Sequence, residues 1–140
     1  GMHEANRSFE YVKNIISGEY VYLLDDDDFL VNPDMISELK AIAKKHNPDV
    51  IVFKAWIKNA NNCDYPTSDV WDSKRPIAGS IGGGCFVVKK DIWKKYIHHF
   101  GKPRMGDFSF ISEVFKNGVH SHWYDCRMCE TGKVSRGAAE

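Results

Sequence analysis

The chain has 140 residues, enough for one domain with a single hydrophobic core. Its 19 basic and 19 acidic side chains balance, so it lacks the basic excess of nucleic-acid-binding proteins, and no nucleic acid is expected as a partner. No apolar run reaches the roughly 20 residues of a membrane-spanning helix. The amino terminus shows no signal-peptide pattern and the four cysteines no dense disulfide framework, which together predict a cytoplasmic protein with reduced thiols.

Hydrophobic periodicity predicts an α/β domain with a mixed sheet flanked by helices over residues 1–140. In the first half of the chain, we expect a helix over 3–17, a strand over 19–24, a helix from Asn32 to His46 and a strand over 49–57. In the second half, we expect a strand over 85–88, a short helix capped by Asp91, a helix from Phe108 that ends at Gly118, and a strand over 119–125. Gly1 before Met2 is interpreted as the remnant of a removed tag.

The first strand and the helix after it carry more specific expectations. The segment 19–24 is apolar on both faces, which favours a central position in the sheet. The next helix is expected to have Asn32 as its cap and Pro33 as its first residue. Its inward side chains would be Met35, Ile36, Leu39, Ile42 and Ala43. The connection over 58–80 shows no strong periodicity, and the polar tail over 130–140 is expected to be flexible.

A run of four aspartates, Asp25 to Asp28, follows the first predicted strand. Four carboxylates this close repel one another, and a bound divalent cation would offset that repulsion. The carboxyl end of a strand is also where open α/β sheets place their ligands. A solvated acidic turn that caps the next helix is the alternative interpretation. The number of carboxylates exceeds the need of a cap and favours metal-assisted chemistry on an anionic substrate.

The segment Gly18-Glu19-Tyr20-Val21-Tyr22-Leu23-Leu24-Asp25-Asp26-Asp27-Asp28, with Pro33 five residues later, resembles the family 2 glycosyltransferases of the GT-A fold. Three later segments are similar to further motifs of that family: Gly82 to Lys90, Gly106-Asp107-Phe108, and Lys133 to Gly137. The resemblance covers nearly the whole chain. The strands and loop with which the family holds the nucleotide base have no counterpart here, so the chain resembles an amino-terminally truncated member.

The resemblance implies a partial GT-A-like fold and an inverting, metal-dependent enzyme that transfers a sugar from a nucleotide-sugar donor to an acceptor hydroxyl. Asp27 would be the main ligand of Mn²⁺ or Mg²⁺, assisted by Asp28, and Asp25 would face the nucleotide ribose or the metal. Asp26 would point away if the strand alternation continues. Asp107 would be the general base. Further donor contacts are expected from Gly83, Gly84, Lys133 and Arg136.

Other interpretations of these residues stay open. Asp107 would serve equally as the N-cap of its helix, and the triglycine as a tight turn. Because the nucleotide-binding half of the family has no counterpart here, a non-catalytic metal- or glycan-binding remnant, or one half of a split glycosyltransferase, is the alternative function. A phosphatase of the haloacid-dehalogenase type also uses aspartates after a buried strand. That family favours threonine or valine where this chain has Phe29.

Two features suggest additional contacts. An edge strand exposed by the truncation would favour a homo-oligomer or a partner chain. Cys126 and Cys129 have the spacing of half a zinc site, and His120 and His122 would share one face of the last strand. Partly buried, hydrogen-bonded histidines are the alternative for that pair.

Overall fold

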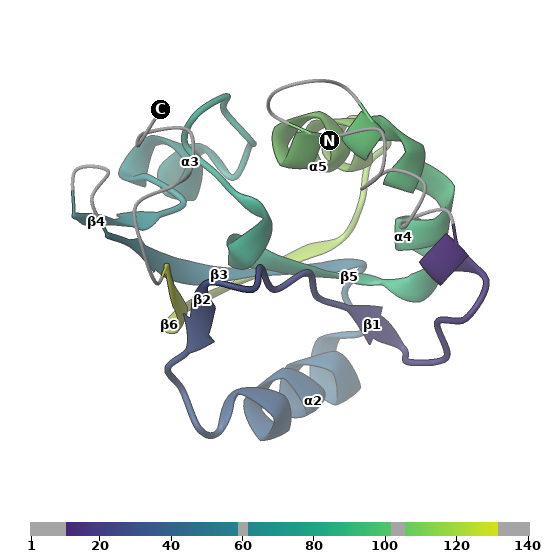
Figure 1. Cartoon of the computed structure of the whole chain (residues 1–140), viewed down its shortest axis with the longest axis horizontal. Coiled ribbons are helices and arrows are strands. Elements are labelled where there is room, and N and C mark those ends of the chain that lie inside the picture. Colours follow the sequence, from purple (N-terminus) through teal and green to yellow (C-terminus); the bar gives the residue numbers. More distant parts are fainter. Residues whose placement is uncertain (1–10, 59–61, 102–105, 132–140) are drawn as a thin grey trace.

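The computed structural model describes residues 11–58, 62–101 and 106–131, and these form a six-stranded mixed sheet with helices on both faces (Figure 1). The strands are β1 (Tyr20–Val21), β2 (Asp28–Leu30), β3 (Val50–Ile57), β4 (Cys63–Tyr65), β5 (Phe86–Lys89) and β6 (Ser121–Thr131). The helices are α2 (Met35–His46), α3 (Ser68–Ser73), α4 (Lys90–Tyr96) and α5 (Gly106–Lys116), with 3-10 turns at Gly83–Cys85 and Ile97–Gly101. The predicted α/β class is therefore confirmed.

The sheet is built around β3, and its order is β1-β5-β3-β6-β2, with β4 added to β3. The β3–β6 pair is parallel, and the other pairs are antiparallel. Residues 50–53 of β3 are all buried because side chains alternate between two covered faces. Val50 and Val52 pack on the side of α4 and α5, whereas Ile51 and Phe53 pack on the side of α2. The predicted strand over 49–57 is confirmed.

The first strand is shorter than predicted and lies at the edge of the sheet, so its expected central position is wrong. Its backbone pairs with β5 only through Tyr20 and Val21. The segment is apolar on both faces because helices cover both sides of the sheet. Tyr20 and Tyr22 pack toward α2, while Val21 and Leu23 pack toward the opposite core. Two-sided burial of side chains therefore does not require two strand neighbours.

Helix α2 begins at Met35, two residues later than predicted, and ends at His46 as predicted. Asn47, in the left-handed conformation with φ 46°, closes it. Asn32 does influence the start of the helix, because its Oδ1 accepts a hydrogen bond from the Asp34 N–H at 2.9 Å. Ile36 was expected to point inward and is instead 62% exposed, since the sheet-facing stripe of the helix runs through Met35, Leu39 and Ile42.

Two short elements occupy the connection for which no structure was predicted. Strand β4 pairs with the end of β3, and α3 follows it after the Tyr65–Pro66 bond. Elements of three and six residues are too short to show a periodicity in sequence. The fold therefore adds a strand and a helical turn beside the end of β3.

The predicted final strand, over 119–125, is wrong in extent, because β6 runs from Ser121 to Thr131. Glu130 and Thr131, expected in a flexible tail, pair with Phe29 and Asp28 of β2. The rest of the predicted tail lies outside the described residues. Of the helix predicted over 3–17, residues 3–10 also lie outside the described residues. Tyr11 to Lys13 are helical, whereas 14–17 are not, so the helix ends four residues earlier than predicted. No described helix is both long enough and apolar enough to cross a membrane.

Candidate functional site

The four aspartates form a turn between β1 and β2, and three of them converge. Oxygen atoms of Asp25, Asp27 and Asp28 all lie within 4.8 Å of one another. The Asp28 N–H donates to the Asp25 carbonyl oxygen at 3.1 Å and holds the turn closed. Asp26 is not part of this group. Among the described residues, no other three His, Cys, Asp or Glu side chains are gathered in this way.

The carboxylates of this cluster raise one another's proton affinity. Burial, followed by the charges of Asp25 and Asp27, raises the pKa of Asp28 to about 6. Burial also raises the pKa of Asp25, and the charges of Asp27, Asp107 and Asp26 add to the increase. A divalent cation would favour the charged forms and relieve this repulsion. A hard cation such as Mg²⁺ or Mn²⁺ therefore fits these oxygen ligands.

Asp107 belongs to the first turn of α5, and two backbone N–H groups fix its carboxylate. The Gly83 N–H donates to its Oδ2 at 3.1 Å, and the Phe108 N–H donates to its Oδ1 at 2.8 Å. The helix begins at Gly106, so Asp107 lies inside the first turn and is not the N-cap of the helix. The negative charge of Asp107 also raises the pKa of Asp25. Asp107 therefore connects α5 to the triglycine through a hydrogen bond and to the acidic turn through its charge.

Gly106 allows this arrangement because no larger residue fits there. A Cβ atom at this position would lie 2.6 Å from the Phe100 carbonyl oxygen, closer than real side chains approach backbone. The start of α5 can therefore pack directly on the end of the preceding 3-10 turn, and it presents Asp107 toward Gly83.

The triglycine forms the tight turn that leads into β5, as one of the two interpretations proposed. The Cys85 N–H donates to the Gly82 carbonyl oxygen at 3.0 Å, and residues 83–85 form the 3-10 turn. The Tyr22 hydroxyl donates to the Gly84 carbonyl oxygen at 3.0 Å. Tyr22 was not among the predicted site residues. It lies three positions before Asp25, and no sequence spacing links it to a partner 62 residues away.

The structure thus brings together six of the predicted site residues and leaves two undescribed. Asp25, Asp27 and Asp28 form the cluster, and Asp107 is bound to Gly83, beside the Gly84 that Tyr22 contacts. Lys133 and Arg136 lie outside the described residues, so their predicted donor contacts stay predictions.

The cysteine and histidine residues near the end of the chain do not assemble a zinc site among the described residues. Cys129 is buried in the core beside α4 and α5, whereas Cys126 packs on the α2 side. Residues three apart on a strand point to opposite faces, which separates the two thiols. The His122 ring stacks on His46 with their centroids 4.5 Å apart. Both cysteines are free thiols.

The mixed sheet, the acidic turn at its edge and the flanking helices define a GT-A-like α/β fold. The chain is similar to three crystal structures of residues 1–349 of TarS from S. aureus, a glycosyltransferase: one without a named ligand, one with UDP and one with UDP-GlcNAc. The TM-scores are 0.64, 0.63 and 0.64, and the sequence identities are 15%, 16% and 15%.

The matched region is most of this chain and a minor part of TarS. It covers 86%, 86% and 89% of this chain, and 38% of each TarS chain. At this level of identity the likeness concerns the fold. Neither the known protein families nor the curated proteins provide a match for the sequence.

Proposed function

We propose that this chain carries the metal and acceptor side of a glycosyltransferase that moves a sugar from a nucleotide-sugar donor to an acceptor hydroxyl with inversion. The observation that carries the proposal is the convergence of Asp25, Asp27 and Asp28 within 4.8 Å, with Asp107 electrostatically coupled to Asp25. Three converging carboxylates suit a cation that neutralises a diphosphate.

Asp27 and Asp28 would hold Mn²⁺ or Mg²⁺, and Asp25 would contact the metal or the nucleotide ribose. When bound, the cation supplies Lewis-acid stabilisation of the departing diphosphate. The Gly83 and Gly84 backbone would face the donor. Lys133 and Arg136 are proposed to contact its phosphates.

Asp107 would act as the general base that removes the acceptor hydroxyl proton. Its two backbone hydrogen bonds hold the carboxylate in one orientation while lone pairs stay available to accept that proton. Holding the carboxylate in this orientation costs little free energy, because its two donors are already fixed at the start of a helix and in a tight turn. A general-base role would explain the carboxylate at position 107, where the side chain does not serve as the helix cap.

The fold likeness supports the choice of donor to test first. TarS has been crystallised with UDP and with UDP-GlcNAc. The chain spans 38% of the TarS structures, so catalysis by this chain alone does not follow from the likeness and is itself proposed. A uridine diphosphate sugar is therefore the first probe.

Titration calorimetry with Mn²⁺, followed by UDP-GlcNAc, tests the metal site. Asp27→Ala should weaken Mn²⁺ binding at least about tenfold, because one of three converging ligands is lost. Asp26→Ala is the matched control and should weaken Mn²⁺ binding much less than Asp27→Ala, since Asp26 lies outside the cluster and contributes only its charge. Equal Mn²⁺ affinity of the wild type and Asp27→Ala, or no binding by either, would contradict the proposal.

Product assays with a panel of acceptor glycans test the base. Asp107→Asn should retain Mn²⁺ binding and lower transfer by about 10²–10⁴-fold, the usual contribution of a general base. The amide preserves the size of the side chain and one acceptor oxygen, so circular dichroism should show an unchanged fold. Full transfer by Asp107→Asn would remove Asp107 from the proposed mechanism.

A non-catalytic remnant or one half of a split enzyme is the second candidate. In this candidate the acidic cluster binds a cation, and the chain by itself transfers no sugar. Mn²⁺ binding without transfer by the chain alone would support this candidate, and turnover by the chain alone would exclude it. The likeness to TarS favours both candidates over a phosphatase, and release of phosphate from generic phosphate esters would contradict that preference.

A further inference from the structure

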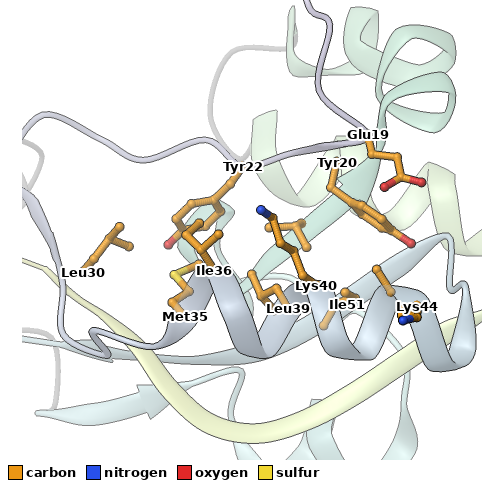
Figure 2. A pocket seen from close by; sticks show the side chains of 12 residues that line it. Glu19, Tyr20, Tyr22, Leu30, Met35, Ile36, Leu39, Lys40, Lys44 and Ile51 are labelled. Atoms are coloured by element: carbon orange, nitrogen blue, oxygen red, sulfur yellow. The ribbon is translucent and has the colours of Figure 1, made fainter.

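An apolar groove of about 600 Å³ lies between the segment around β1 and helix α2 (Figure 2), and neither Asp107 nor the triglycine lines it. Met35 and Leu39 of α2 and Ile51 of β3 contribute to its floor, with Val87 of β5. Tyr20 and Tyr22 form the opposite wall. The groove therefore connects the edge of the sheet with the exposed side of α2.

The wall of the groove that Tyr20 and Tyr22 form is apolar, although both side chains carry a hydroxyl group. The Tyr20 hydroxyl donates to the Pro48 carbonyl oxygen at 2.6 Å, and the Tyr22 hydroxyl donates to the Gly84 carbonyl oxygen at 3.0 Å. With both hydroxyls used inside the domain, the rings offer carbon surface to the groove. Leu30 and Ile36 line the same groove and are 47% and 62% exposed. These exposed side chains extend the apolar surface of the groove toward solvent.

The backbone at this edge is also available for pairing. Among the described residues, β1 has β5 as its one strand neighbour. An edge strand of this kind can pair with another strand through its free N–H and C=O groups. The groove and the free edge adjoin, because Tyr20 belongs to both.

The rims of the groove carry opposite charges. Glu19 lies on the β1 side, and Lys40 and Lys44 lie one helical turn apart on the α2 side. Within the described part of the chain, none of these three side chains forms an ion pair. Figure 2 shows Lys40 extending from α2 toward the segment that holds Tyr20 and Tyr22. A surface with both charges beside one apolar strip can complement a copy of itself.

We propose that this groove binds a second copy of the chain in an isologous dimer. The two β1 edges would pair antiparallel about a two-fold axis, and each Glu19 would meet Lys40 and Lys44 of the other copy. The formal net charge of zero removes any long-range repulsion between the copies. A small molecule in the groove would leave the β1 edge unpaired, whereas a second copy uses the edge, the apolar strip and the charges together.

Light scattering coupled to size exclusion measures the first consequence, a species of twice the 16.0 kDa chain mass that dissociates on dilution. Ile36→Lys should raise the dissociation constant at least about tenfold, because it places a charge in the contact. Ile77→Lys is the matched control. Ile77 is 41% exposed but does not line the groove, so this variant should dimerise like the wild type.

Charge reversal provides the second, sharper test. Glu19→Lys alone, and the double variant Lys40→Glu with Lys44→Glu, should each be monomeric, because each homodimer would oppose like charges twice. An equimolar mixture of the two should recover a heterodimer, because both contacts then join opposite charges. Fluorescent labelling of one variant would detect it.

Several results would overturn the proposal. These are a monomer at every concentration reached, a dimer that Ile36→Lys does not weaken, and a mixture that shows no heterodimer. A chain that dimerises only after residues 1–10 are removed would show that its own terminus fills the groove, and this too would overturn the proposal.

Discussion

At the residue scale, the run of four aspartates does not act as four equivalent charges. The turn directs Asp25, Asp27 and Asp28 toward one point and leaves Asp26 outside the group. The alternation of side chains along an extended segment predicts this division in part, because Asp25 and Asp27 are two residues apart. Asp28 joins them because its backbone closes the turn on Asp25. A local hydrogen bond thus adds the third candidate ligand.

The raised pKa of Asp28 predicts a dependence of stability on pH in the cation-free protein. Its pKa rises from 3.8 to about 6 on folding, so the folded state holds the proton more tightly than the unfolded chain. The stability that this group contributes is present below its unfolded pKa and is lost as the pH rises through the folded value. Thermal unfolding followed by circular dichroism should show this loss between about pH 4 and pH 7.

Asp28→Asn should flatten that dependence, and Asp26→Asn should change it much less, because the Asp26 charge is the smallest of the contributions to the raised pKa of Asp28. Added Mn²⁺ should reverse the trend, because the cation competes with the proton and stabilises the folded state most when Asp28 is ionised. An unaltered slope in Asp28→Asn would show that another group controls the pH dependence.

At the scale of the elements, Asn32 links the start of α2 to the rest of the fold. Its Oδ1 accepts from the Asp34 N–H, and its Nδ2 donates to Glu38 Oε2 at 2.9 Å. The same Glu38 oxygen accepts from the Tyr124 hydroxyl of β6 at 2.8 Å. The first turn of the helix is therefore held to β6 by a chain of side-chain hydrogen bonds.

Asn32→Ala should lower the free energy of unfolding by about 1–3 kcal/mol, because it leaves part-buried polar groups without their partners. Ser37→Ala removes one exposed hydrogen bond in the same turn and should change stability by less than about 0.5 kcal/mol. Urea unfolding of the two variants measures the difference. Equal effects would mean that the Asn32 network contributes nothing beyond an ordinary surface contact.

At the scale of the whole molecule, one strand divides the core into two clusters. Val50 and Val52 of β3 belong to the cluster beside α4 and α5, and Ile51 and Phe53 belong to the cluster beside α2. Phe53 is fully buried and meets the Tyr22 ring with their centroids 5.5 Å apart. The α2 cluster therefore supports both the acidic turn, through Tyr22, and the groove.

Phe53→Ala should lower the free energy of unfolding by about 3–5 kcal/mol, since it leaves a cavity in the smaller cluster. Phe29→Ala is the matched control, because Phe29 is 56% exposed, and it should cost about 0.5 kcal/mol or less. Denaturant unfolding followed by tryptophan fluorescence compares the two. A small effect of Phe53→Ala would show that the α2 side of the sheet can repack around the lost ring.

Long apolar segments made much of the fold predictable. The predicted caps Asn32 and Asp91 are wrong, because Asp34 and Lys89 are the N-cap residues of α2 and α4. The buried strand β3, the end of α2 at His46 and the helical faces of α4 and α5 follow from residues within a few positions of one another. The edge position of β1, the short elements β4 and α3, and the length of β6 did not follow. These depend on which strands meet after folding, and local periodicity contains no record of strand order.

The candidate site likewise has features that local sequence predicts and contacts that only folding creates. An acidic run after an apolar segment, and a glycine-aspartate pair before an apolar helix, are chemical signals contained in a few consecutive residues. The contact of Asp107 with Gly83, 24 residues away, and that of Tyr22 with Gly84, 62 residues away, arise only when the sheet and α5 pack together. Short-range signals name the chemistry because charge and backbone preference act locally. Folding selects which of those residues meet, because only packing brings distant segments within hydrogen-bonding distance.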